Sequence, residues 1–131
     1  MRSTPAVFSI RQPYRQWKGD SFGRLPVLCL RVMIVIRNVF HLKFGKTREA
    51  LAILKEGIAI HKRSGAEFNA RLLTDITGPF YTIVLELTVP GMSYFETDMP
   101  KMMSNPDWQT NYQKLLPHVE SGHRELYTLI E

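Results

Sequence analysis

Residues 34–44 read Ile34-Val-Ile-Arg-Asn-Val-Phe-His-Leu-Lys-Phe44, and this stretch decides the fold. β-branched and aromatic side chains dominate the run, and apolar and polar residues alternate weakly along it, which predicts a β-strand. Gly45 follows directly and ends the strand. The folded part of the chain therefore begins with a strand, and the next elements determine how that strand is covered.

A helix is predicted after this strand. Thr47 is a good N-cap, and Glu49 lies in the first turn, where the helix dipole favours a carboxylate. The basic run at residues 61–63 and the stop at Gly65 close the helix. Its inner face is predicted from side chains at helical spacing, which are Leu51, Leu54, Ile58 and His61.

Two strands are predicted next, over residues 68–76 and 81–89, joined by the turn Thr77-Gly-Pro79. The later strand is nearly all apolar or β-branched apart from Glu86, which is typical of a strand covered on both faces. Pro90-Gly91 breaks it.

Two helix starts are predicted in the following region. Ser93 with Glu96 forms a capping box, and Pro100 should kink that helix or end it early. Asn105 followed by Pro106 is the pattern of an N-cap with proline at the first helical position. The helix that it starts presents one shared face, formed by Trp108, Tyr112, Leu115 and Leu116.

A turn at Ser121-Gly122 and a final strand over residues 124–130 complete the order β-α-β-β-α-β. This order predicts an α+β, ferredoxin-like fold, with an antiparallel sheet and both helices on one face. The other sheet face would be bare on a monomer, and a symmetric copy of the same sheet is its simplest cover. The sequence therefore predicts a homodimer.

The net charge of +5 is confined to the start of the chain. Residues 1–32 hold six Lys or Arg against one Asp, whereas residues 33–131 hold eleven of each sign. The leading segment is therefore expected to be a disordered basic extension, a transit peptide, or a wrongly assigned stretch before a true start at Met33. One domain is expected over residues 33–131.

Several classes of site are not expected in that domain. The single cysteine, Cys29, lies before it, which fits a cytoplasmic protein and leaves no disulfide or thiolate metal site. The four histidines lack paired metal-ligand spacing, so no metal site is predicted. The domain carries no phosphate-binding glycine loop, no nucleophile elbow, no excess of basic charge for nucleic acid and no membrane span.

Four short motifs occur in order between Met33 and Glu131: Asn38-Val-Phe-His-Leu-Lys-Phe-Gly45 with Lys46, Thr77-Gly-Pro79, Trp108-Gln-Thr-Asn-Tyr112 and Val119-Glu-Ser-Gly-His-Arg-Glu125. They resemble the dimeric α/β-barrel superfamily, in particular its NIPSNAP-like branch, which is related to antibiotic-biosynthesis-type monooxygenases. Three positions depart from the branch, which usually has Arg-x-Tyr in the first strand and Pro before the glycine. This chain has Asn38, Phe40 and Phe44 there.

The resemblance implies a pocket between sheet and helices, close to the first strand and the second helix. It implies a homodimer that binds or transforms a small planar hydrophobic molecule, as a cofactor-independent monooxygenase does. Tyr112, His41 and Asn38 are then expected to hydrogen-bond a substrate oxygen. The ligand-binding residues are expected to be Trp108, Phe40 and Arg124.

Simpler roles remain open for the same residues. Trp108 and Tyr112 have the spacing of an ordinary packing pair. Arg124 is a possible ion-pair partner of Glu120 or Glu125. His41 shares its strand face with Arg37 and Lys43, which fits a solvated or dimer-edge position, and strand alternation places it opposite Asn38 and Phe40. The helix-end histidines, His61 and His118, are expected to be structural.

Two other functions are consistent with the pattern. A dimeric scaffold would fill the same interior with its own Phe, Met, Leu and Ile side chains. Haem degradation in the superfamily uses an Asn in the first strand, with a Trp and an iron-ligating His from the second helix. Asn38 fits that pattern, but Tyr112 stands at the ligand position and Met102 at the Trp position.

Overall fold

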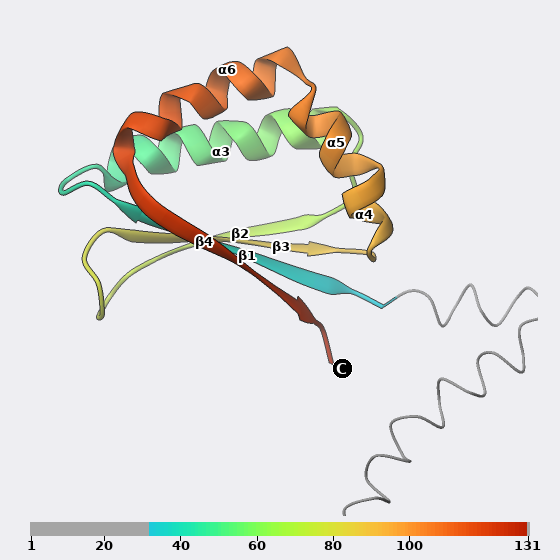
Figure 1. Cartoon of the computed structure of the whole chain (residues 1–131), viewed down its shortest axis with the longest axis horizontal. Coiled ribbons are helices and arrows are strands. Elements are labelled where there is room, and N and C mark those ends of the chain that lie inside the picture. Colours follow the sequence, from blue (N-terminus) through green and yellow to red (C-terminus); the bar gives the residue numbers. More distant parts are fainter. Residues whose placement is uncertain (1–31, 131) are drawn as a thin grey trace, which may run out of the picture. The chain divides into compact units, whose positions relative to one another are not determined.

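The computed structural model describes residues 32–130, so the predicted basic segment lies outside the described residues except for Val32. The sheet is antiparallel with the strand order β2-β3-β1-β4, and the helices lie on one of its faces (Figure 1). The elements are β1 (Ile34–Leu42), α3 (Thr47–Arg63), β2 (Asn69–Thr74), β3 (Thr82–Val89), α4 (Ser93–Glu96), α5 (Asp98–Met103), α6 (Pro106–Leu115), a short 3₁₀ helix (Leu116–His118) and β4 (Val119–Thr128). The predicted ferredoxin-like α+β fold is confirmed.

Within residues 32–130, no helix combines the length and the apolar character that crossing a membrane requires.

Two of the three predicted helix caps are wrong. Lys46 rather than Thr47 precedes α3, because the turn at Gly45, which has a φ of 78°, closes with a Lys46 N–H bond to the Lys43 carbonyl. Met92 precedes α4, and no side chain caps that short helix. The third prediction is confirmed, since Asn105 Oδ1 accepts the Asp107 N–H at 2.9 Å and Pro106 begins α6.

The second helical region breaks before its proline. The break falls at Thr97, between α4 and α5, and Pro100 lies in the first turn of α5. Pro100 has no N–H to donate to the carbonyl of Glu96, four residues before it, and its ring clashes with that carbonyl, so the helix begun at Ser93 ends early, as predicted. The connection from β3 to α6 is therefore made of two short helices.

The predicted turn at Ser121-Gly122 is wrong, because both residues lie inside β4, opposite His41 and Phe40 of β1. The strand begins at Val119, five residues earlier than predicted. A Cβ at Gly122 would lie 2.7 Å from the Val39 carbonyl oxygen. This glycine therefore permits a close approach of two strands instead of a reversal of the chain.

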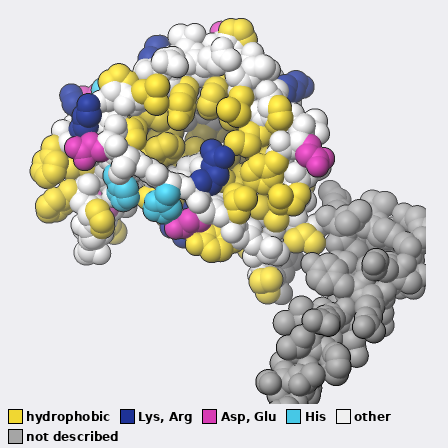
Figure 2. Space-filling view, viewed as in Figure 1, with side chains coloured by type: hydrophobic (Ala, Val, Ile, Leu, Met, Phe, Trp, Pro, Cys, Tyr) yellow, Lys and Arg dark blue, Asp and Glu magenta, His cyan; other side chains and the backbone are white. Residues whose placement is uncertain are grey.

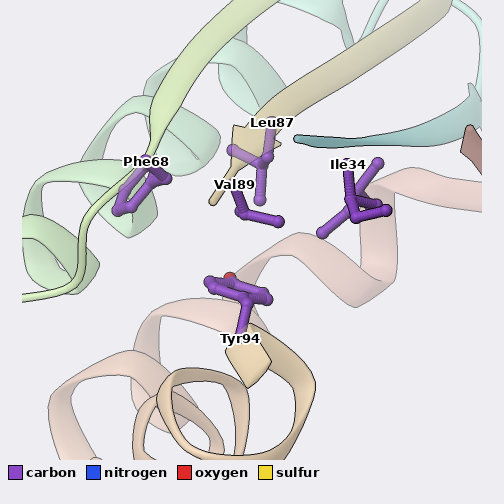
Figure 3. Packing of buried hydrophobic residues seen from close by; sticks show 6 residues of the cluster. Ile34, Phe68, Leu87, Val89 and Tyr94 are labelled. Carbon is purple, nitrogen blue, oxygen red and sulfur yellow. The ribbon is translucent and has the colours of Figure 1, made fainter. Parts of the chain in front are cut away.

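The hydrophobic core consists of two separate clusters at the two ends of the sheet. The first joins β1, β3, α4 and the residue before β2 through Ile34, Ile36, Phe68, Leu87, Val89 and Tyr94. Figure 3 shows the side chains of Ile34, Leu87, Val89 and Tyr94 close together. The second joins the other end of β1 and β3 to α3 and α6 through Leu42, Ala50, Leu54, Ile83 and Leu115. The helix-facing side of the sheet is thus tightly packed at each end, and the region between the two clusters holds the candidate site.

Candidate functional site

A cavity of about 1060 Å³ lies between the two core clusters. On the helix-facing side of β1, Ile36 belongs to one cluster and Leu42 to the other, and Asn38 and Phe40 between them line the cavity. Helices α3 and α6 form the opposite wall. Figure 2 shows the hollow, with hydrophobic side chains around it and a basic side chain at its edge. A volume of this size suits a small organic molecule.

Trp108 and Tyr112 of α6 contribute a flat aromatic surface to this cavity. Their rings stack with centroids 4.9 Å apart and an interplanar angle of 13°. Trp108 is half-buried and Tyr112 is 37% exposed, so the pair lies at the boundary between cavity and solvent rather than in the core. The two aromatic rings pack on each other and also line the cavity.

Arg124 and Asn38 form the polar part of the sheet wall. They lie opposite each other on β4 and β1, and Arg124 Nε donates to Asn38 Oδ1 at 2.7 Å. The sequence suggested an ion pair with Glu120 or Glu125, but no carboxylate of residues 32–130 lies within ion-pair distance of Arg124. Among residues 32–130, no Asp, Glu or Lys and no other Arg lines the cavity, so this guanidinium gives the described wall a net positive charge.

His61 and Tyr94 form a second polar group, on the helix side. Each is only 3% exposed, His61 Nε2 lies 2.8 Å from Tyr94 Oη, and the imidazole stacks on Phe68 at 4.7 Å. Burial lowers the pKa of His61, and the nearby carboxylate of Asp98 opposes part of that effect. Burial, with Asp98 adding to it, raises the pKa of Tyr94 to about 12, and the charge of Arg124 acts in the other direction. Both side chains are therefore neutral at pH 7.

His41 lies on the other face of the sheet and does not line the cavity. Its Nδ1 lies 3.3 Å from Thr82 Oγ1, and its ring centroid is 6.3 Å from that of His123. The strand alternation that placed His41 opposite Asn38 explains this position. Its position gives no support to a role in the pocket. His118, in the 3₁₀ helix, does not line the cavity either.

Among the polar residues of the cavity wall for which the sequence predicted no ligand-binding role are His61 and Asn111, and Tyr94, the hydrogen-bond partner of His61, was not predicted either. Asn111 is buried in the wall and donates from Nδ2 to the Ile53 carbonyl at 2.8 Å, which ties α6 to α3. Its position three residues after Trp108, on the same helix face, was a usable signal. The pairing of His61 with Tyr94 had no signal, because the two are 33 residues apart.

No protein-family model matches this sequence, and no curated protein matches it with significance. Solved structures do match. A NIPSNAP-like domain protein from Burkholderia xenovorans superposes with a TM-score of 0.67 at 18% identity, covering 77% of this chain and 87% of that one. A NIPSNAP family protein of unknown function from Agrobacterium tumefaciens superposes with a TM-score of 0.67 at 20% identity, covering 76% and 89%. The fold is that of the NIPSNAP proteins.

The NIPSNAP fold of this chain is also similar to that of SnoaB from Streptomyces nogalater, described as a cofactor-independent oxygenase. The TM-score is 0.59 at 15% identity, and the match covers 76% of this chain and 95% of SnoaB. The resemblance inferred from the sequence motifs is thus confirmed at the level of the fold.

Proposed function

We propose that this chain is a cytoplasmic homodimer whose cavity binds a small planar hydrophobic molecule that carries an oxygen or an anionic group. The observation that carries the proposal is the cavity of about 1060 Å³ between two packed core clusters. A scaffold would fill this volume with its own side chains, since protein interiors pack to high density.

The lining of the cavity supports a ligand with two chemical parts. The stacked rings of Trp108 and Tyr112 offer flat apolar area to a ring system. On the sheet wall, Arg124 and Asn38 can hydrogen-bond an oxygen of the same molecule. Phe40 extends the apolar wall beside Asn38.

The homodimer is supported by the side of the sheet that faces away from the helices. Opposite charges on that side lie close to each other, because Arg37 Nε is 3.9 Å from Glu86 Oε2 and 3.8 Å from Glu125 Oε1. Such a surface, with Tyr127 and Leu73 among its exposed apolar side chains, is suited to a second copy of the sheet.

For the reaction, we propose oxygenation of an electron-rich ring by dioxygen without a cofactor. The fold shared with the oxygenase SnoaB supports this. The chain would hold the ring in an apolar site and orient it through hydrogen bonds from Asn38, Arg124 and Tyr112. Oxygen uptake in the presence of 1,5-dihydroxynaphthalene, above the rate in buffer alone, is the expected result.

The binding test uses N-phenyl-1-naphthylamine, a neutral planar dye that becomes fluorescent in apolar surroundings. Saturable binding of about one dye per chain is expected. The variant Leu85→Trp places a larger side chain in the cavity wall and should weaken binding at least about tenfold. Leu116→Trp is the matched control, because Leu116 is exposed and does not line the cavity.

Two results would contradict the proposed function. Failure of the dye to saturate the wild-type chain would favour a scaffold. Equal binding by the Leu85→Trp variant would show that the dye binds somewhere other than this cavity.

A further inference from the structure

The hydrogen bond between Arg124 and Asn38 determines what this pair offers to a ligand in the cavity. Arg124 Nε donates to Asn38 Oδ1 at 2.7 Å, across the pairing of β4 with β1. A guanidinium can only donate hydrogen bonds, so the bond also fixes the orientation of the amide, with Oδ1 facing Arg124 and Nδ2 facing elsewhere. The only acceptor atom in these two side chains is therefore already bonded to a charged donor.

The atoms that the pair leaves available are donors. Within residues 32–130, neither Asn38 Nδ2 nor the two Nη atoms of Arg124 has a hydrogen-bond partner. Each of these three nitrogens carries two N–H groups. No Asp or Glu of the described residues lines the cavity to accept from them. The group that matches the pair is one that accepts several hydrogen bonds and donates none, as an ionised acid does.

The charge of the wall distinguishes between the common acidic groups. Among the described residues, Arg124 is the only Arg or Lys that lines the cavity. A phosphate monoester carries about two negative charges at pH 7, of which one guanidinium compensates only a part. A carboxylate carries a single charge, and its two oxygens match two parallel N–H groups of a guanidinium. The site is therefore better suited to a carboxylate.

The position of the pair places the charged end of a ligand toward solvent. Arg124 is exposed and Asn38 is half-buried, and Figure 2 shows a basic side chain at the edge of the hollow. The strand wall of the cavity continues with the apolar side chains of Phe40, Leu85 and Leu87. A carboxylate at the mouth keeps part of its hydration, while the ring that carries it leaves water for the apolar wall.

The charge of Arg124 also acts on the helix-facing side of the sheet. It opposes the rise in the pKa of Tyr94, a side chain of α4 that is only 3% exposed. The guanidinium therefore acts on groups beneath the helices as well as on solvent, which is the position that a ligand between sheet and helices requires.

We propose that the cavity selects planar aromatic carboxylates, with the carboxylate held at the mouth by the Nη atoms of Arg124 and by Asn38 Nδ2, and the ring against the apolar wall. The inference rests on the proposed function and narrows its ligand to a molecule with one carboxylate. Asn38 is also a positioning residue, because its Oδ1 holds Nε and leaves the Nη edge of the guanidinium to the ligand. No covalent bond forms or breaks in this recognition.

The test compares 2-naphthoate with 2-naphthamide on the full chain at pH 7.5, by isothermal titration calorimetry. The two probes have nearly the same shape, but the carboxylate only accepts hydrogen bonds, whereas the amide carries two donors. The wild type is expected to bind 2-naphthoate about tenfold more tightly. Because Arg124 is exposed, water competes for its guanidinium and limits the preference to about this size. Equal affinities for the two probes would overturn the inference.

Asn38→Asp is the decisive variant, because it places a carboxylate of the chain itself against Arg124. The affinity for 2-naphthoate should fall at least about tenfold, while the affinity for 2-naphthamide stays the same. Asn69→Asp is the matched control, since Asn69 is exposed on β2, lies outside the cavity wall and receives the same added charge. An unchanged preference for 2-naphthoate in Asn38→Asp would overturn the inference.

A second variant keeps the test decisive should Asn38→Asp fail to fold. Arg124→Met retains an unbranched side chain and removes the charge, so it should bind the two probes with equal affinity. A preference for 2-naphthoate that survives in Arg124→Met would also overturn the inference.

The failures of the two proposals are distinct. If neither naphthalene probe nor the naphthylamine dye binds the wild type, the proposed function fails. If all three bind and the wild type treats 2-naphthoate and 2-naphthamide alike, only the selection of a carboxylate fails.

Discussion

The two faces of β1 differ in whether the arginines on them are paired with carboxylates. On the face away from the helices, Arg37 lies between the carboxylates of Glu86 and Glu125. On the helix-facing side, Asn38 meets Arg124, and no carboxylate of residues 32–130 pairs with that guanidinium. One face therefore holds charges that neutralise each other, and the other holds a charge that is available to a ligand.

The histidines show the same contrast. His123, on the outer face, is exposed and lies 3.0 Å from Glu125 Oε2. The hydrogen bonds of His123 and Tyr127 to Glu125 lower the pKa of that carboxyl. His61, in the cavity wall, has a phenol as its partner and no ion pair within residues 32–130. The charged groups on the outer face thus pair with one another, whereas the imidazole in the cavity wall pairs with an uncharged phenol.

The largest effect is expected from Gly122→Ala, which acts on both faces at once. The added Cβ would lie 2.7 Å from the Val39 carbonyl oxygen, so the β1–β4 pair must separate or shift. We expect a loss of about 2–4 kcal/mol in the free energy of unfolding, measured by urea denaturation. Ser121→Ala, next to it in the same strand, is the control and should change stability by less than about 0.5 kcal/mol. Equal stability of the two variants would contradict the close approach.

A second substitution separates the two faces by their arginines. Arg124→Gln should weaken binding of 8-anilinonaphthalene-1-sulfonate about tenfold and leave binding of the neutral naphthylamine dye unchanged, because only the former carries an anion. Arg71→Gln is the matched control, since Arg71 donates from Nε to Glu86 at 3.0 Å and does not line the cavity. An equal loss with both dyes would assign Arg124 a structural role.

A third prediction concerns the stability of the fold at acidic pH, which should depend on the buried imidazole of His61. Burial holds the folded-state pKa of His61 below the ordinary imidazole value of 6.5, so below pH 6.5 the unfolded chain takes up a proton that the folded chain does not. Stability is therefore lost as the pH falls from 6.5 through the folded-state pKa. Thermal melts between pH 7.5 and 5 should show that His61→Phe removes part of this loss, whereas His118→Phe does not. Parallel curves for the wild type and His61→Phe would contradict the burial of a neutral imidazole.

The smallest effect is expected from Tyr112→Phe. The side chain is 37% exposed and stacks on Trp108, and the substitution keeps the ring. The melting temperature should change by less than about 2 °C, while the affinity for the anionic dye falls about two- to threefold through loss of the hydroxyl. A drop of more than about 5 °C would instead assign Tyr112 to the core and weaken its place in the cavity wall.

Periodicity predicted the order of the main elements because each is long enough to show its own repeat. It did not predict the start of β4, since a glycine that permits close strand approach and a glycine that turns the chain look identical in sequence. The partner of Arg124 was missed for a related reason. Local carboxylates were the nearest candidates along the chain, whereas Asn38 lies 86 residues away and meets it only in the folded sheet.

For the cavity, alternation along β1 placed His41 and Asn38 on opposite faces, but only the folded helices determine which face is covered. The helical spacing put His61 on the inner face of its helix without revealing Tyr94 as its partner. Residues that touch across distant parts of the chain carry no local pattern. The chemistry of the site therefore had to come from the structure.

The close approach of β1 and β4 at Gly122 determines the sign of the charge that lines the cavity. Side chains alternate along β4, so Arg124 faces inward and Glu125 outward only in the observed pairing with β1. Sliding β4 by one residue would exchange them and turn a cation-lined chamber into an anion-lined one, with an unchanged composition. Because only glycine fits against the Val39 carbonyl at this point, Gly122 fixes which side chains of β4 face the cavity, and so the sign of its charge, although it carries no charge itself.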